Sequence, residues 1–167
     1  MNSQSSSLLR SIAITGIIIG ALDAIAGIIH TAIFTKVGPL AMFRYIASGV
    51  FGESAFAGGI PMAVLGVFFH FSIASGWTAL LYLIYPKLGF VRFNKIPSGI
   101  GYGMFIWLMM NLIIVPLSHA PNDPITFKVS TLVMFLIHIF VIGVPMMYLT
   151  GNYFSKNNVL NRKQVNL

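Results

Sequence analysis

Four polar or titratable residues stand near the middles of four long apolar runs: Asp23, His70, Asn111 and His138. Such side chains are costly in hydrocarbon and are uncommon there without a partner or a role. A carboxyl group beside imidazoles at one depth in a membrane can take up and release protons, because histidine titrates near neutral pH. The four residues therefore predict a polar layer, with Asp23, His70 and His138 as a candidate proton-handling site.

The members of this layer are expected to differ in role. A charged carboxylate at mid-depth costs a few kcal/mol or more, so Asp23 has to be protonated or paired with a protonated histidine. A buried amide such as that of Asn111 commonly serves as hydrogen-bonding glue between spans, contributing about 1 kcal/mol. We expect Asn111 to serve packing. For Asp23, His70 and His138, two interpretations stay open: a functional site, or hydrogen bonds that only hold the spans together.

A second polar set is expected near one membrane face, in and beside the loops. It consists of His30, Glu53, His119 and Asp123, with Arg44 nearby in the sequence. His30 shares a helical face with Asp23 and lies about 10 Å from it along the axis. Convergence of the set would make a vestibule above the polar layer, whereas a solvated loop rim is the simpler interpretation.

Cofactor and enzyme chemistry find little support in the sequence. His70 and His138 lie at similar depth on spans of the same direction, so a haem with two histidine ligands is one hypothesis. No covalent haem motif and no metal-ligand motif of the H-E-x-x-H type occurs. Nucleophile elbows, phosphate loops and dinucleotide fingerprints are missing too. We therefore expect no catalytic residues, no metal and no cofactor, and a protein that is not an enzyme.

The composition places these residues in a membrane. Of the 167 residues, 57% are hydrophobic and 8% are charged, whereas a soluble domain has about 25% charged residues. The absence of cysteine excludes disulfides and thiol chemistry. The net charge of +7 does not indicate nucleic-acid binding, because the basic residues stand at the ends of the apolar runs and form no continuous patch.

The apolar runs predict an all-α integral membrane four-helix bundle, a single domain over residues 1–167, because about 20 apolar residues cross the hydrocarbon core as a helix. The expected spans are residues 11–34, 60–85, 97–118 and 127–150. Gly16-x-x-x-Gly20 and Gly99-x-x-x-Gly103 favour close packing between spans and are expected to turn the polar layer inward. The alternation typical of a membrane β-barrel is missing.

Residues 39–51 predict a short amphipathic helix after the first span, lying at the membrane interface or dipping into the bundle. Its apolar face would hold Leu40, Phe43, Ala47 and Val50. A plain interfacial helix is the simpler expectation, and a lid over the bundle is the alternative.

The basic residues predict the orientation. Seven of the ten Lys and Arg side chains belong to the two tails and the second loop. Because positive residues are enriched on the cytoplasmic side, both termini are expected there. Arg10 and the sequence Ala24-Ile-Ala26 suggest a cleavable signal peptide, but the apolar run is long for one and favours a span.

The third span begins Pro97-Ser-Gly-Ile-Gly-Tyr-Gly, continues with Asn111-Leu-Ile-Ile-Val-Pro-Leu-Ser-His-Ala-Pro121, and is followed by His138 on the next span. With these motifs the C-terminal half resembles the YagU-like group of small bacterial inner-membrane proteins, which have no established activity. The resemblance implies a multi-pass protein of the bacterial inner membrane, and it supplies no catalytic residues. The first outer loop is more compact than in that group.

Two functions follow as hypotheses. The first is a membrane protein that moves or senses protons or a small solute through Asp23, His70 and His138. The second is a structural or assembly protein whose small-residue stripes pack against other transmembrane subunits or a second copy. The expected partners are the lipid bilayer and such subunits, and a haem-bearing redox protein is a third alternative.

Overall fold

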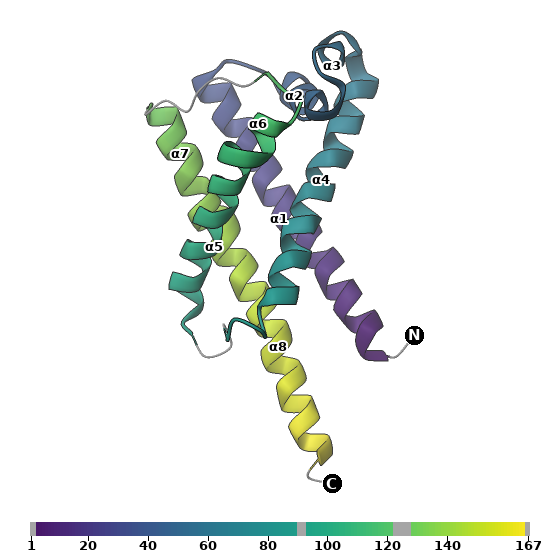
Figure 1. The fold of residues 1–167 in the computed structure, drawn as a ribbon, viewed down its shortest axis with the longest axis vertical. Helices are drawn as coiled ribbons and strands as arrows, with labels where there is room; N and C mark the ends of the chain where they lie inside the picture. The colour runs from purple at the N-terminus through teal and green to yellow at the C-terminus, as the bar shows by residue number, and fades with distance from the viewer. Residues whose placement is uncertain (1–2, 90–92, 122–127, 166–167) are drawn as a thin grey trace.

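Long helices form a bundle with both chain ends at the same end, as the computed structural model in Figure 1 shows. The structure describes the backbone of residues 3–89, 93–121 and 128–165. These residues form helices and no strands, which confirms the all-α prediction. In chain order the helices are α1 (Ser3–Phe34), α2 (Pro39–Phe51), α3 (Ser54–Ala57), α4 (Gly59–Ile84), α5 (Lys95–Met109), the π-helix η2 (Met110–Ile114), α6 (Val115–Leu117), α7 (Val129–Ile137), the π-helix η3 (His138–Gly143) and α8 (Val144–Val165).

Four helical stretches are long and apolar enough to cross a membrane, as predicted. They are Ser5–Phe34, Gly59–Ile84, Lys95–Leu117 and Val129–Lys156. The first and last helices extend beyond the predicted spans, since α1 begins at Ser3 and α8 continues to Val165. A helix that already exists adds residues more easily than a new one begins, so the polar tails continue the spans as helix.

Glycines of α1 set its distance from α4. A Cβ atom at Gly16 would lie 2.8 Å from the Ser75 hydroxyl oxygen, and one at Gly20 would lie 2.7 Å from the Phe71 ring. Contacts this short are possible only because glycine has no side chain. The first of the predicted G-x-x-x-G stripes therefore lies at a contact between two spans.

The second glycine stripe brings the last two spans together. A Cβ atom at Gly99 would lie 2.7 Å from the Cα of Val144, and one at Gly103 would overlap the carbonyl oxygen of His138. Gly143 on the opposite helix fits against the Gly103 backbone in the same way. Helix α5 therefore touches η3 and the start of α8 backbone to backbone.

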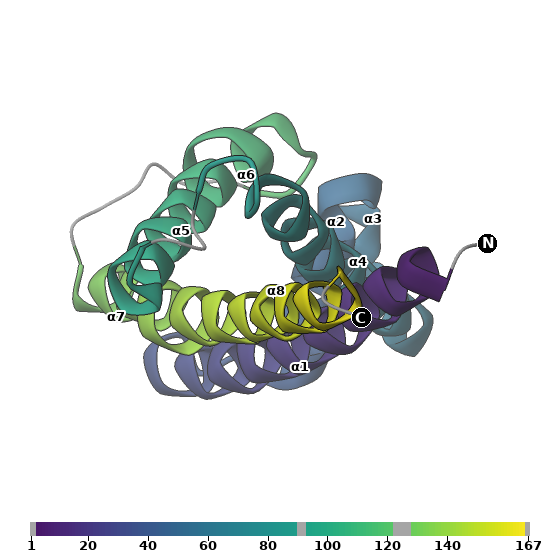
Figure 2. The same ribbon diagram turned by 90° about the horizontal axis from the view of Figure 1, so that it is seen from below.

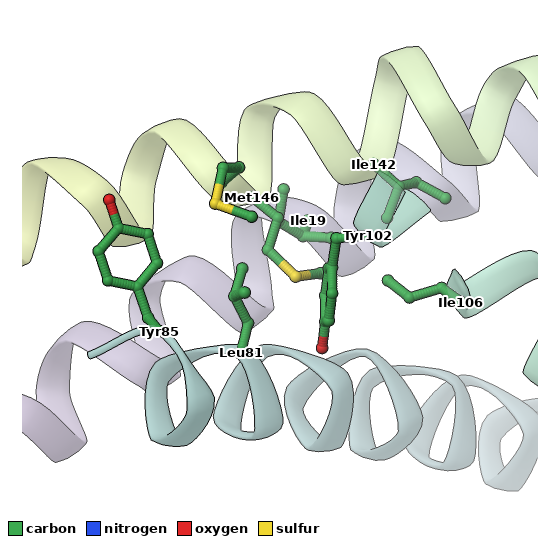
Figure 3. Packing of buried hydrophobic residues seen from close by; sticks show 8 residues of the cluster. Ile19, Leu81, Tyr85, Tyr102, Ile106, Ile142 and Met146 are labelled. Atoms are coloured by element: carbon green, nitrogen blue, oxygen red, sulfur yellow. The ribbon is translucent and has the colours of Figure 1, made fainter. Parts of the chain in front are cut away.

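The hydrophobic core lies in the half of the bundle that holds the chain ends. Figure 3 shows its side chains converging from α1, α4, α5, η3 and α8. Its members are Ile19, Leu81, Tyr85, Tyr102, Ile106, Ile142, Met146 and Met147. Viewed from below in Figure 2, α8 runs beside α1. The outside of the bundle carries large apolar side chains such as Ile60 and Phe68, 66% and 63% exposed, as lipid-facing surfaces do.

Helix α2 is present over the predicted residues and lies at the end of the bundle opposite the chain ends (Figure 1). It packs against α4 so closely that a Cβ atom at Gly66 would overlap the Phe43 carbonyl group. This contact positions α2 over one end of the bundle interior.

The four residues of the predicted apolar face of α2 do not all pack against the bundle. Leu40 and Val50 are each 54% exposed, while Ala47 and Ser48 are fully buried. Ser48 can be buried because its hydroxyl donates a hydrogen bond to the carbonyl oxygen of Tyr45, at 2.6 Å. Small side chains, rather than the most apolar ones, therefore face the bundle.

Candidate functional site

One cavity of about 100 Å³ in the middle of the bundle is lined by three of the four residues of the predicted polar layer. Asp23 comes from α1, His70 from α4 and His138 from the start of η3. The rest of the wall is aliphatic or aromatic. The fold therefore brings one carboxyl group and two imidazoles to a single space between membrane-spanning helices.

The cavity is bounded on two sides. Ile19, Ile142 and Met146 belong both to its wall and to the hydrophobic core, which lies towards the chain ends. On the opposite side, Ile46 of α2 lines the cavity. The Phe43 ring of α2 also stands edge-on to the His70 imidazole, with 6.1 Å between ring centres. Helix α2 thus covers the cavity at the end where the core does not.

The His70 imidazole joins α4 to α1. Its Nε2 lies 2.9 Å from the carbonyl oxygen of Gly20. Because a carbonyl oxygen can only accept, Nε2 carries the proton, and Nδ1 is the nitrogen that can gain a second one. The same Nε2 lies 4.0 Å from a carboxylate oxygen of Asp23. That distance is too long for a hydrogen bond but allows an ion pair whenever His70 is protonated.

His138 has the opposite tautomer. Its Nδ1 lies 2.9 Å from the carbonyl oxygen of Met134, one turn earlier in its own helix. Nδ1 therefore carries the proton, and Nε2 is the nitrogen free to gain one. His70 and His138 are both only 9% exposed, so both rings lie inside the bundle. Each ring makes one hydrogen bond to a backbone carbonyl group.

Asp23 is the least constrained group of the site. Its side chain is 27% exposed, and within the described part of the chain no group donates a hydrogen bond to it. Its ionised form needs a counter-charge, which protonated His70 would supply, or water. A cavity volume of about 10–15 Å³ is enough for one water molecule, so the cavity of about 100 Å³ has room for several water molecules.

Asn111 is not part of this site. Its amide nitrogen donates a hydrogen bond to the carbonyl oxygen of Trp107 at 2.9 Å, within its own helix, and it does not line the cavity. The cavity therefore joins three of the four residues of the predicted layer, without Asn111. The amide also does not serve as glue between spans, because its bond partner lies four residues earlier in the same helix.

Two π-helices, which the sequence prediction missed, surround these positions. Asn111 lies in η2, and His138 begins η3. Each π-helix ends two residues before a proline, Pro116 or Pro145. Proline lacks an N–H and clashes with the carbonyl group four residues earlier, and membrane helices relieve this with local π turns. Pro116 and Pro145 are thus the sequence signal that would have predicted a change from α-helical to π-helical hydrogen bonding at both sites.

The described members of the second polar set make separate contacts. The His30 Nε2 donates a hydrogen bond to the Ser130 carbonyl oxygen at 2.9 Å, linking α1 to α7. Glu53 is exposed between α2 and α3, and the His119 side chain is exposed beside the end of α2. No hydrogen bond or ion pair joins the three side chains within the described residues. The vestibule stays a prediction, and Asp123 lies outside the described residues.

The hypothesis of haem bound by two histidines, and the expectation of no metal, stay predictions. Within residues 3–89, 93–121 and 128–165, no group of three or more His, Asp or Glu side chains is placed to hold a metal ion. The cavity is also several-fold smaller than the roughly 300–1,000 Å³ of common ligand sites.

The likeness of the third span to the YagU-like group stays a prediction. Comparison of the chain with protein-family models, with curated proteins and with solved structures gives no match.

Proposed function

We propose that this protein moves protons across a membrane through the cavity between Asp23, His70 and His138. The observation that carries the proposal is that three titratable side chains from three helices line one space inside a bundle of membrane-spanning helices. Ionisable groups inside a membrane are costly and commonly mark proton relays.

The tautomers support a relay. His70 and His138 each donate one ring hydrogen to a backbone carbonyl group, so the second nitrogen of each ring is available for a proton. A proton gained by His70 produces a cation 4.0 Å from the Asp23 carboxylate, which stabilises both charges. Because all three side chains line one cavity with room for water, we propose that water carries the proton between them.

The proposal places the protein in a bacterial inner membrane with both termini in the cytoplasm. The excess of Lys and Arg in the tails and the second loop supports this orientation. Helix α2 would then lie at the outer interface, between the aqueous phase and the cavity. Protons would then pass between the outer aqueous phase and the cavity beside α2.

The test is proton flux into liposomes that contain the purified protein and a pH-sensitive dye, driven by a potassium gradient with valinomycin. The parent protein should acidify the interior faster than protein-free liposomes. Asp23→Asn keeps the shape of the side chain but cannot ionise, so flux should fall to the protein-free level. Circular dichroism and size-exclusion chromatography check that the variant is folded.

His119→Gln is the matched control, since it removes an exposed titratable group that does not line the cavity. Its flux should equal that of the parent. Parent flux no higher than that of protein-free liposomes, or flux unchanged by Asp23→Asn, would refute the proposal. Such a result, with co-purification of a defined membrane complex, would favour the structural or assembly role instead.

A further inference from the structure

A second and larger hollow lies between the last two spans, away from the central cavity. Its volume is about 570 Å³, within the range of small-molecule sites. Met104, Trp107 and Leu108 of α5 form one wall, and Thr131, Leu132 and Phe135 of α7 form the other. We call it the α5–α7 groove. Apart from Lys128, the polar groups among its lining residues are the Thr131 hydroxyl and the Trp107 indole N–H.

The groove exists because the two helices cross. Gly99 and Gly103 bring α5 against η3 and α8 in the lower half of the bundle. Above that contact, Figure 1 shows α5 and α7 diverging. The Trp107 and Phe135 rings meet edge-on at 5.2 Å between ring centres and line the hollow. Lipid-facing side chains therefore surround a hollow that no part of the described chain fills.

A cation stands at the mouth of this groove. Lys128 lines it, is exposed and directly precedes α7. Within the described residues, no carboxylate lies within ion-pair distance of its ammonium group. From Lys128 to Phe135 the groove runs about 10 Å along the helix axis, less than the roughly 15 Å of one hydrocarbon leaflet. The groove thus has a charged end at the membrane surface and an apolar end inside one leaflet.

We infer that the α5–α7 groove binds a phospholipid with an anionic head group, whose acyl chain lies between the two helices and whose phosphate lies beside Lys128. The apolar walls match an acyl chain, and the ammonium group matches a negative head group. Lys128 directly precedes α7, which begins at the end of the bundle opposite the chain termini (Figure 1), so the lipid comes from that leaflet. This inference does not depend on proton movement through the central cavity.

The two tryptophans of the chain allow a direct test, because Trp107 lines the groove and Trp77 lines the central cavity. In the Trp77→Phe protein, fluorescence reports on the groove alone. The protein is placed in two kinds of phosphatidylcholine vesicle. One kind contains phosphatidylglycerol with brominated acyl chains, and the other contains the same mole fraction of phosphatidylcholine with brominated acyl chains. Bromine quenches tryptophan on contact, so quenching measures occupancy by each lipid.

Brominated phosphatidylglycerol should occupy the groove about fivefold more readily than brominated phosphatidylcholine, which corresponds to about 1 kcal/mol for one lysine at a membrane surface. Lys128→Gln should abolish the preference. Lys36→Gln is the matched control, since it removes an exposed lysine from the turn after α1, at the same end of the bundle. It should keep the preference.

Three outcomes would overturn the inference. The first is equal quenching by the two brominated lipids in the Trp77→Phe protein. The second is a preference that survives Lys128→Gln. The third is a preference that both lysine variants lose equally, which would show general attraction to a positive surface. Circular dichroism of each variant confirms its helix content before quenching is compared.

Discussion

The contact between α5 and η3 gives the sharpest stability prediction. A Cβ atom at Gly103 would overlap the His138 carbonyl oxygen and lie 2.7 Å from the Cα of Ile139. Both atoms belong to the backbone and cannot rotate aside, so the helices have to separate. Overpacking of this kind costs about 1–3 kcal/mol. We expect Gly103→Ala to lower the free energy of unfolding by that amount.

Gly101 provides the control on the same helix. A Cβ atom there would meet nothing within 4 Å, and the residue is exposed. Because alanine favours helix over glycine by up to about 1 kcal/mol, Gly101→Ala should leave stability unchanged or raise it. The two variants differ from the parent by the same single methyl group at positions two residues apart.

The assay is reversible unfolding in mixed detergent micelles, followed by circular dichroism as the mole fraction of sodium dodecyl sulfate rises. The Gly103→Ala transition should come at a lower mole fraction than that of the parent, and the Gly101→Ala transition should not. Equal midpoints for the two variants would refute the close backbone contact. They would also remove the reason for placing His138 beside α5.

Two further predictions concern α2 and the end of α4. A Cβ atom at Gly66 would overlap the Phe43 carbonyl group, whereas one at Gly76 would meet nothing within 4 Å. The backbone amides of α2 should therefore exchange with deuterium faster in the Gly66→Ala protein than in the Gly76→Ala protein. Equal exchange in the two proteins would contradict the close contact between α2 and α4. Burial raises the pKa of the Tyr85 phenol above its usual 10.0. The stability that the neutral phenol provides is then present below that pH and lost as pH rises past it. Tyr85→Phe should accordingly lose less unfolding free energy than the parent between about pH 9 and pH 11 in detergent denaturation, and an equal loss would argue against burial.

The sequence predicted the spans well because length and apolar composition determine what crosses a membrane. Helix α2 also matches its predicted residues, 39–51, where Pro39 suits the first turn of a helix. The orientation of α2 could not be predicted in the same way. In hydrocarbon, apolar side chains such as Leu40 and Val50 gain little by facing the protein, and small ones such as Ala47 permit the closest packing.

The candidate site was partly predictable. Equal depth on four spans identified Asp23, His70 and His138, and the glycine stripes indicated inward faces. Depth alone could not decide which side of its helix each residue occupies, and Asn111 shows the consequence, since it bonds to the carbonyl group of Trp107 instead. The backbone partners of His70 and His138 depend on the helix crossing and the π turn, which sequence spacing does not specify.

The π-helices have a consequence for how length changes act on this chain. Each one holds an extra residue within a helical turn, and one residue corresponds to about 100° of rotation about the helix axis. Deleting a residue within Met110–Ile114 would restore an ordinary turn and leave Val115–Leu117 facing nearly the same way, because the π turn already absorbs that residue. In these two segments a one-residue deletion is therefore absorbed locally, whereas in the regular α-helical parts of the spans it would rotate every side chain beyond it by that angle.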